Sequence, residues 1–98
     1  MKNCNNMTEV RTEIDRVDRL IVTLLVERLG YISQAGVIKQ DRGVVRDEWR
    51  VEDVVAKVKA ACAAEGGDTQ MIEDVYRHLI NWSIEHEFTV FDKENSED

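Results

Sequence analysis

Residues 8–40 read TEVRTEIDRVDRLIVTLLVERLGYISQAGVIKQ, and this stretch decides the fold. Its apolar residues recur at intervals of three and four, which is the period of an α-helix. Thr8 is the expected N-cap, with Glu9 in the first turn, where the helix dipole favours a negative charge. The pattern therefore predicts one long helix whose apolar stripe comprises Val10, Ile14, Val17, Ile21, Leu24, Leu25, Ile32, Ala35 and Ile38.

Two further helices are predicted, over residues 47–64 and 69–90. Two consecutive glycines lie between them, and glycine ends helices because it adopts the left-handed conformation without steric cost. No alternation typical of a strand is sustained anywhere in the chain. We therefore expect a single all-α domain of three helices, spanning residues 1–98, with disordered polar tails at 1–7 and 92–98.

The length of the first helix bears on assembly. At 1.5 Å per residue, residues 8–40 span about 50 Å, whereas a compact domain of this size has a radius of gyration of about 13 Å. The helix must therefore extend beyond what its own chain can cover, although its apolar stripe runs the whole length. We expect a second copy to cover it, in an intertwined homodimer with symmetric contacts. The alternative is a long exposed helix whose far end frays.

The composition excludes several classes of protein. Thirteen Lys and Arg against twenty Asp and Glu give a net charge of −7, the wrong sign for a generic nucleic-acid or anionic-membrane binder. No apolar run approaches the ~18 residues of a membrane span and no secretory signal is visible, so we expect a cytoplasmic protein. Cys4 and Cys62 fit a free tail thiol and a small core thiol, and neither His78 nor His86 belongs to a metal-ligand motif.

Charged side chains interrupt the inward faces of two predicted helices. Arg28 and Lys39 both lie on the apolar stripe of the first helix, eleven residues apart and nearly in phase. A buried cation is costly without an anion. On the third helix, Ser83 and Glu87 are one turn apart and also face inward. Glu87 is therefore either the counter-ion of Lys39 or part of a binding site.

The segment VVRDEWRV at 44–51 adds Arg46 and Arg50, which are i,i+4 neighbours at the start of the second helix. A solvated charged turn is the ordinary interpretation of such a cluster. The other interpretation is a cationic pocket in an acidic protein, suited to a small polyanion whose carboxylates the guanidinium groups would bind in bidentate fashion. That pocket would also include Arg11, Arg28 and Lys39.

Several motifs recur together along the chain: R-x-x-I-D-R-V-D-x-x-I at 11–21, L-L-x-x-R-x-x-x-I at 24–32, Gly36, Lys39, V-R-D-E-W-R at 45–50 and H-L-I-N-W-S-I-E-H-E at 78–87. In these motifs, from residue 8 to about residue 90, the sequence resembles the all-helical chorismate mutases and the related isochorismate-pyruvate lyases. The resemblance implies an intertwined dimer of three-helix chains that acts on a small dianionic substrate without metal or cofactor.

The resemblance assigns a role to each anomalous charge. Arg28 and Arg11 of the partner subunit correspond to the two arginines that hold the substrate's carboxylates. Seventeen residues of straight helix place Arg11 about 25 Å from Arg28, too far for one small substrate, so a crossing partner helix must supply Arg11. Lys39 and Glu87 correspond to the groups on either side of the ether oxygen. Further substrate contacts are implied at Asp47, Arg50 and Ser83.

Val51 departs from the mutase pattern. Mutases of this family carry a glutamate there, which binds the ring hydroxyl, whereas the lyase relatives have an apolar residue. Glu52 is one residue further and about 100° round the helix, so it does not replace that glutamate. The implied activity is the Claisen rearrangement of chorismate to prephenate, and the alternative is cleavage of isochorismate to salicylate and pyruvate. A third interpretation is a non-catalytic dimerisation module whose inward charges form buried salt bridges.

Overall fold

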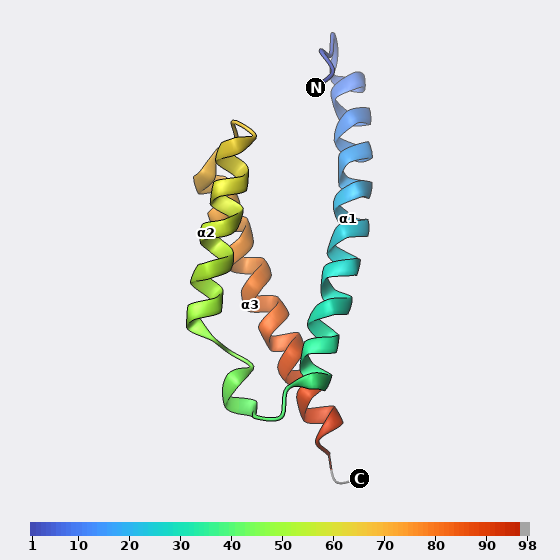
Figure 1. Ribbon diagram of the computed structural model, residues 1–98. Coiled ribbons are helices and arrows are strands. Elements are labelled where there is room, and N and C mark those ends of the chain that lie inside the picture. Colours follow the sequence, from blue (N-terminus) through green and yellow to red (C-terminus); the bar gives the residue numbers. More distant parts are fainter. Residues whose placement is uncertain (97–98) are drawn as a thin grey trace. The chain divides into compact units, whose positions relative to one another are not determined.

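The prediction of an all-α chain is confirmed. The computed structural model describes residues 1–96, and that part of the chain contains three α-helices and one turn of 3₁₀-helix (Figure 1). In chain order they are α1 (Met7–Ile38), η1 (Arg42–Val44), α2 (Glu48–Ala64) and α3 (Thr69–Glu94). The chain divides into two compact units, Met1–Tyr31 and the part from Ile32 onward, so that the last turns of α1 belong to the second unit.

The start of α1 differs from the prediction. The Asn6 side chain accepts a hydrogen bond from the backbone N–H of Glu9 at 2.9 Å, and Glu9 Oε2 accepts one from the backbone N–H of Asn5 at 2.8 Å. These reciprocal bonds satisfy donors that would otherwise be exposed at the helix start. Asn6 is therefore the N-terminal capping residue of α1, and the assignment of this role to Thr8 is wrong.

The end of α3 also differs, because the helix continues past Val90 to Glu94. Phe91 is buried, and the Asp92 carboxylate pairs with Arg42 of η1, Nε to Oδ1, at 3.0 Å. These contacts hold the additional turn in helical conformation. The tail expected from residue 92 thus begins later than predicted, and residues 97–98 of that tail lie outside the described residues.

The turn between α2 and α3 follows the sequence prediction. Gly66 has φ 73°, the left-handed conformation that glycine favours after a helix. A Cβ at Gly67 would lie 2.7 Å from Cys62 Sγ, so this second glycine is required for close approach. Asp68 then begins α3, because its side chain accepts hydrogen bonds from two backbone N–H groups of the first turn.

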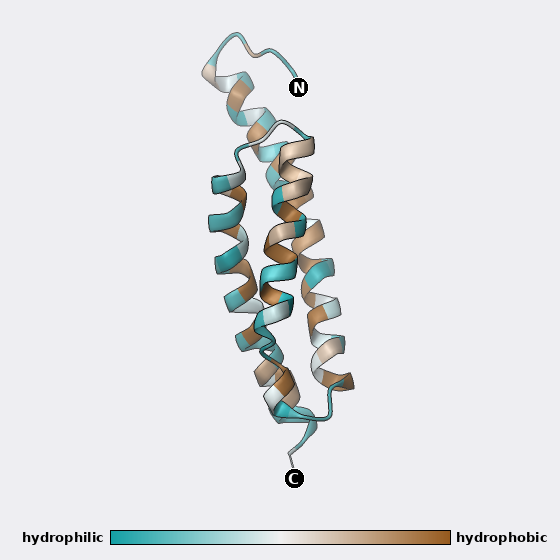
Figure 2. Cartoon of the chain, turned by 60° about the vertical axis from the view of Figure 1, so that its left-hand side comes forward, coloured by the Kyte–Doolittle hydropathy of each residue, from teal (hydrophilic) through white to brown (hydrophobic). Residues whose placement is uncertain are grey.

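Helices α2 and α3 are antiparallel neighbours that enclose the core of the second unit (Figure 1). Hydrophobic and hydrophilic bands alternate along both helices (Figure 2), as expected when one face of each is buried. The core cluster consists of Val51, Val55 and Ile80, with Val54, Tyr76 and Ile84 packed against it. Val75 of α3 is exposed in the single chain, although helical periodicity predicts that it faces inward with Ile72 and Leu79.

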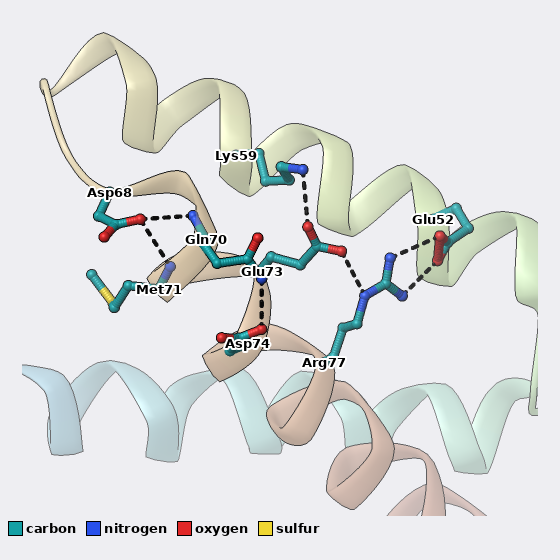
Figure 3. Close-up of polar contacts among 8 residues, drawn as sticks. All are labelled: Glu52, Lys59, Asp68, Gln70, Met71, Glu73, Asp74 and Arg77. Carbon is teal, nitrogen blue, oxygen red and sulfur yellow. Dashed lines mark hydrogen bonds and ion pairs between the residues drawn. The ribbon is translucent and has the colours of Figure 1, made fainter.

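A network of ion pairs joins α2 and α3 along one edge (Figure 3). The Arg77 guanidinium binds the Glu52 carboxylate through two hydrogen bonds of 2.8 and 2.9 Å, and it donates a third to Glu73 at 2.9 Å. Lys59 Nζ donates to the other oxygen of Glu73 at 2.9 Å. Hydrogen bonds from Lys59 and Arg77 hold the pKa of Glu73 below its ordinary value, and Arg77 lowers the pKa of Glu52. The network fixes the register of the two helices.

In the first unit, α1 exposes most of its apolar stripe in the single chain, including Val17, Ile21 and Leu24. Between Arg19 and Lys39 the only charged residues are Glu27 and Arg28. By length and composition, α1 is therefore long and apolar enough to cross a membrane, and the expectation that no stretch reaches this criterion is wrong. Helices buried in protein interfaces satisfy the same criterion, because they too are covered by apolar surroundings.

The network predicts a pH-dependent contribution of Glu73 to stability. Because the folded-state pKa of Glu73 is lowered, its contribution is fully present above the ordinary value of 4.5 and is lost as pH falls through the lowered value. We expect Glu73→Gln to lower Tm at pH 7 by a few degrees and to flatten the loss of Tm on acidification below pH 4.5. Thermal unfolding at fixed protein concentration measures this. Glu65→Gln, which removes a carboxylate outside the network, should leave the acid limb unchanged; equal profiles for both variants would contradict the assignment.

Candidate functional site

The second unit contains a partly buried charged pair. Lys39 Nζ lies 2.8 Å from Glu87 Oε2, and the Glu87 residue is only 5% exposed. Lys39 directly follows α1, with its backbone N–H still bonded to Ala35, and Glu87 lies in α3. The two residues are 48 positions apart in the sequence. The expectation that both side chains face inward is thus met, and they contact each other.

The last turns of α1 contact α3 closely because Gly36 has no side chain. A Cβ at this position would lie 3.0 Å from Val90 Cβ and 3.1 Å from the backbone oxygen of Glu87. One turn earlier, Ser33 Oγ and His86 Nε2 are hydrogen-bonded at 2.8 Å. The sequence S-x-x-G-x-x-K at 33–39 therefore presents three successive positions to α3. Ser33 supplies a hydroxyl, Gly36 allows close approach, and Lys39 supplies the cation that pairs with Glu87.

The connector between α1 and α2, residues 39–47, contributes a further contact to the Lys39–Glu87 pair. Asp41 Oδ1 accepts a hydrogen bond from the backbone N–H of Gly43 at 2.8 Å, which stabilises η1. Val45, directly after η1, is buried, and its carbonyl oxygen accepts a longer bond of 3.5 Å from Lys39 Nζ. An ammonium group has three donors. With Glu87 and Val45 as partners, Lys39 retains one donor for a further acceptor.

Ser83 and Val51 are both buried in the second unit. Ser83 is one turn before Glu87 on α3, is 3% exposed and donates a hydrogen bond to the carbonyl of Leu79 at 2.7 Å. Val51 belongs to the buried apolar cluster between α2 and α3. A hydroxyl and an apolar side chain thus stand in the part of α2 and α3 that the sequence analysis assigned to substrate contacts.

Asp47 and Arg50 make contacts within α2. The Asp47 side chain caps the helix by accepting the backbone N–H of Arg50 at 3.3 Å. Arg50 Nη1 donates to Asp53 at 2.6 Å, and both Asp47 and Arg50 are exposed. Hydrogen bonds from Lys57 and Arg50 lower the pKa of Asp53. The structure therefore gives Asp47 a capping role and pairs Arg50 with Asp53, and sequence analysis missed both contacts.

Arg11 and Arg28 belong to the first unit, Met1–Tyr31. Arg28 is half-buried and Arg11 is exposed. Because α1 is one uninterrupted helix, the 17-residue spacing places their Cα atoms about 25 Å apart. The two arginines of a single chain therefore cannot both contact one small dianion.

Sequence analysis missed the contacts of Arg42. Its guanidinium binds Asp92 through two hydrogen bonds, 3.0 Å from Nε and 3.4 Å from Nη2, and its Cζ lies 4.5 Å from the centre of the Phe88 ring. Residues 41–44, with the sequence DRGV, can be recognised as a turn. However, Asp92, the partner of Arg42 on α3, is 50 residues away, and neither helical periodicity nor turn chemistry predicts this contact.

Within the described residues, no group of three or more His, Cys, Asp and Glu side chains could hold a metal ion. Cys4 and Cys62 are free, half-buried thiols. His86 is hydrogen-bonded to Ser33 and stacks on Trp82, with ring centroids 5.7 Å apart. The site that the geometry defines is accordingly one of hydrogen-bond donors and charge, with Lys39 and Glu87 at its centre.

Comparison with known proteins agrees with the resemblance. The family model of chorismate mutase type II matches residues 10–88. An isochorismate pyruvate lyase of Pseudomonas aeruginosa is 29% identical over 84 residues, which cover 85% of this chain and 82% of that protein. A T-protein of Haemophilus influenzae is also 29% identical, over 82 residues that cover 83% of this chain but only 22% of the relative. The chain is thus similar to most of the first protein and to about a fifth of the second.

The close approach at Gly36 predicts a selective effect of one methyl group. The Glu87 carbonyl cannot move without distorting α3, so Gly36→Ala should separate the two helices. Overpacking costs about 1–3 kcal/mol, and the gain in helix propensity offsets about 1 kcal/mol of this. We expect a net loss of about 1 kcal/mol in the free energy of unfolding, measured by urea denaturation. Gly30→Ala is the control, because a Cβ there meets nothing within 4 Å, and it should not destabilise. A Gly36→Ala protein as stable as the wild type would show that this contact is not tight.

Proposed function

Because the chain belongs to the chorismate mutase type II family, we propose that it catalyses the Claisen rearrangement of chorismate to prephenate. The observation that supports this most strongly is the pair formed by Lys39 and the buried Glu87, with Nζ and Oε2 2.8 Å apart. A buried carboxylate beside an ammonium group contributes little net stability compared with an apolar pair of similar size. Its presence favours a chemical role.

The rearrangement breaks the ether C–O bond and forms a C–C bond within one molecule, so it requires no nucleophile and no oxidant. What the protein must supply is conformation. Arg28, together with Arg11 of the partner subunit, would bind the two substrate carboxylates in bidentate fashion and fold the enolpyruvyl arm over the ring. Arg50 and Asp47 border the site from the start of α2. Orientation of this kind removes much of the entropic barrier of a pericyclic step.

The second contribution is electrostatic. As the C–O bond stretches ahead of C–C bond formation, the ether oxygen becomes partly negative. The remaining donor of Lys39 and a protonated Glu87 would both hydrogen-bond to it. In comparable preorganised sites, one such donor is worth roughly 3–4 kcal/mol in the transition state. In the absence of substrate the two side chains satisfy each other, which keeps both in place for the reaction.

A second candidate activity is isochorismate-pyruvate lyase, and Val51 favours it. Val51 lies in an apolar cluster with Val55 and Ile80, where a hydroxyl of the substrate would find no partner from α2. The similar Pseudomonas aeruginosa protein bears this activity in its name. The lyase reaction uses the same carboxylate clamp but transfers a ring hydrogen to the enolpyruvyl methylene as the C–O bond breaks, which gives salicylate and pyruvate.

The proposed site requires two chains. The exposed apolar stripe of α1 and the spacing of Arg11 and Arg28 both support a homodimer in which each active site takes Arg11 from the partner subunit. The apolar surface of α1 would be buried in that dimer, since contiguous exposed patches of this kind mark interfaces. A soluble dimer also accounts for the membrane-like composition of α1 without a bilayer, and we propose that the enzyme acts in the cytoplasm.

The direct test offers purified protein chorismate and isochorismate in parallel and quantifies prephenate, salicylate and pyruvate. We expect prephenate from chorismate as the faster reaction. Efficient salicylate formation with slow prephenate formation would replace the first candidate by the second. No turnover of either compound by a folded dimer would reject both activities. The remaining interpretation would then be a non-catalytic dimerisation module.

The shared site predicts complementation between inactive variants. Arg11→Ala and Arg28→Ala should each be nearly inactive, because each homodimer lacks one carboxylate contact in both sites. After subunit exchange, each heterodimer contains one site with both arginines. Activity should therefore reappear on mixing, and the assay is turnover before and after verified exchange. If exchange is complete and no activity returns, the two arginines do not serve one shared site.

The donor role of Glu87 predicts how two substitutions differ. Only the protonated carboxyl group can donate a hydrogen bond, and the ionised group would repel the developing charge. Glu87→Gln keeps a neutral donor of similar length and should retain most of the wild-type kcat/KM, whereas Glu87→Leu has no donor and should lose about a hundredfold or more. Measurement of kcat/KM for both variants decides this. Equal losses in the two variants would mean that Glu87 serves only as the partner of Lys39.

A further inference from the structure

The connector between α1 and α2 is attached to α3 at two places. At its start, Lys39 pairs with Glu87, and at η1, Arg42 binds Asp92 and covers the Phe88 ring. Glu87 and Phe88 are adjacent in the sequence, and Asp92 is one turn further along the same helix. Residues 39–42 therefore run beside a single stretch of α3, joined to it by two charge-assisted contacts.

Backbone hydrogen bonds connect the two attachments. Within η1 the backbone N–H groups of Val44 and Val45 donate to the carbonyls of Asp41 and Arg42, each at 3.2 Å. The Val45 carbonyl in turn accepts from Lys39 Nζ. A displacement of Arg42 would move Val45, and with it one of the two oxygen partners that fix the direction of the Lys39 ammonium group.

We propose that Arg42 is a positioning residue for the reaction, which acts by holding the connector against α3 so that Lys39 keeps its orientation. This inference rests on the proposed function of the Lys39–Glu87 site. Arg42 itself contacts neither Lys39 nor Glu87 in the described structure; its guanidinium is directed to Asp92 and to Phe88.

The Arg42–Asp92 pair is exposed, so its effect on the position of the connector can be measured apart from its effect on stability. The side chains of Arg42 and Asp92 are 60% and 53% exposed, and exposed ion pairs contribute little to the free energy of unfolding. Two parallel hydrogen bonds and a cation over an aromatic face nevertheless impose a defined geometry. The hydrogen bond to Asp92 also raises the pKa of Arg42. Loss of this contact should therefore release the connector without unfolding the α2–α3 core.

The test measures two properties of Arg42→Ala: steady-state kinetics, and amide hydrogen exchange of the free dimer by NMR. We expect kcat at saturating substrate to fall about fivefold, because one weak tether on the connector is lost. We also expect faster exchange at the Val44 and Val45 amides and unchanged exchange in the α2–α3 core. Arg42→Lys, which keeps a cation near Asp92 and Phe88, should recover part of both effects.

Arg77→Ala is the matched control, because Arg77 also binds a carboxylate with two parallel hydrogen bonds but joins α2 to α3 far from the connector in sequence. It should lower Tm at least as much as Arg42→Ala and leave kcat and the exchange of Val44 and Val45 unchanged.

The outcomes distinguish this inference from the proposed function. Unchanged kcat and unchanged connector exchange in Arg42→Ala, with an active wild type, would overturn the positioning role alone. An equal loss of kcat in Arg77→Ala would overturn it as well, since the effect would then be general destabilisation. A rise in KM with kcat unchanged would mean that Arg42 binds substrate directly, which also contradicts the inference. Failure of the wild type to act on chorismate or isochorismate would reject the proposed function, whatever the exchange data show.

Discussion

A buried carboxylate must have a cation, and in this chain that constraint joins Glu87 to Lys39. Glu87 is 5% exposed, and its Oε2 lies 2.8 Å from Lys39 Nζ. Removal of either partner would leave an uncompensated buried charge, which is strongly destabilising. The pair forms only if the last turns of α1 lie directly against α3, and Gly36 permits this because any side chain there would meet Val90 and the Glu87 backbone. The position of the last turns of α1 against α3 follows from this contact.

Under the proposed function, the same pair explains how a few residues can serve a pericyclic rearrangement. Such a reaction requires a defined substrate conformation and stabilisation of charge on one oxygen, and fixed cations and hydrogen-bond donors would supply both. We therefore interpret the Lys39–Glu87 pair as retained for chemistry, while the α2–α3 core and the Arg77 network maintain the fold.

The sequence predicts those features that depend on local or periodic information. Helical periodicity places the three helices, and the Gly66-Gly67 pair ends α2. Phase along each helix is sufficient to turn both Lys39 and Glu87 inward. Contacts between residues distant in the sequence are harder to predict. The Arg42–Asp92 pair holds the part of α3 beyond Val90, and the sequence around either residue does not predict its partner.

Other differences come from competition between similar local signals. Asn6 caps α1 in place of Thr8, because Glu9 completes a reciprocal pair of hydrogen bonds at the earlier position. Arg50, which could have pointed to a ligand, binds Asp53 one turn away. The apolar stripe of α1 meets a membrane criterion because that criterion considers only length and composition. Neither quantity tells whether protein or lipid covers the stripe.

The central claim is that the Lys39–Glu87 pair serves catalysis more than stability, and the Lys39→Met/Glu87→Leu double variant tests it most directly. The measurement is kcat/KM on the substrate that the wild type turns over, with thermal unfolding of the same sample. Replacing a buried ion pair by apolar residues of similar size is commonly neutral or stabilising, so Tm should be at least that of the wild type. Turnover should fall by about a thousandfold or more, because both donors to the reacting oxygen are lost. A double variant that unfolds more easily than the wild type yet retains its activity would contradict this account.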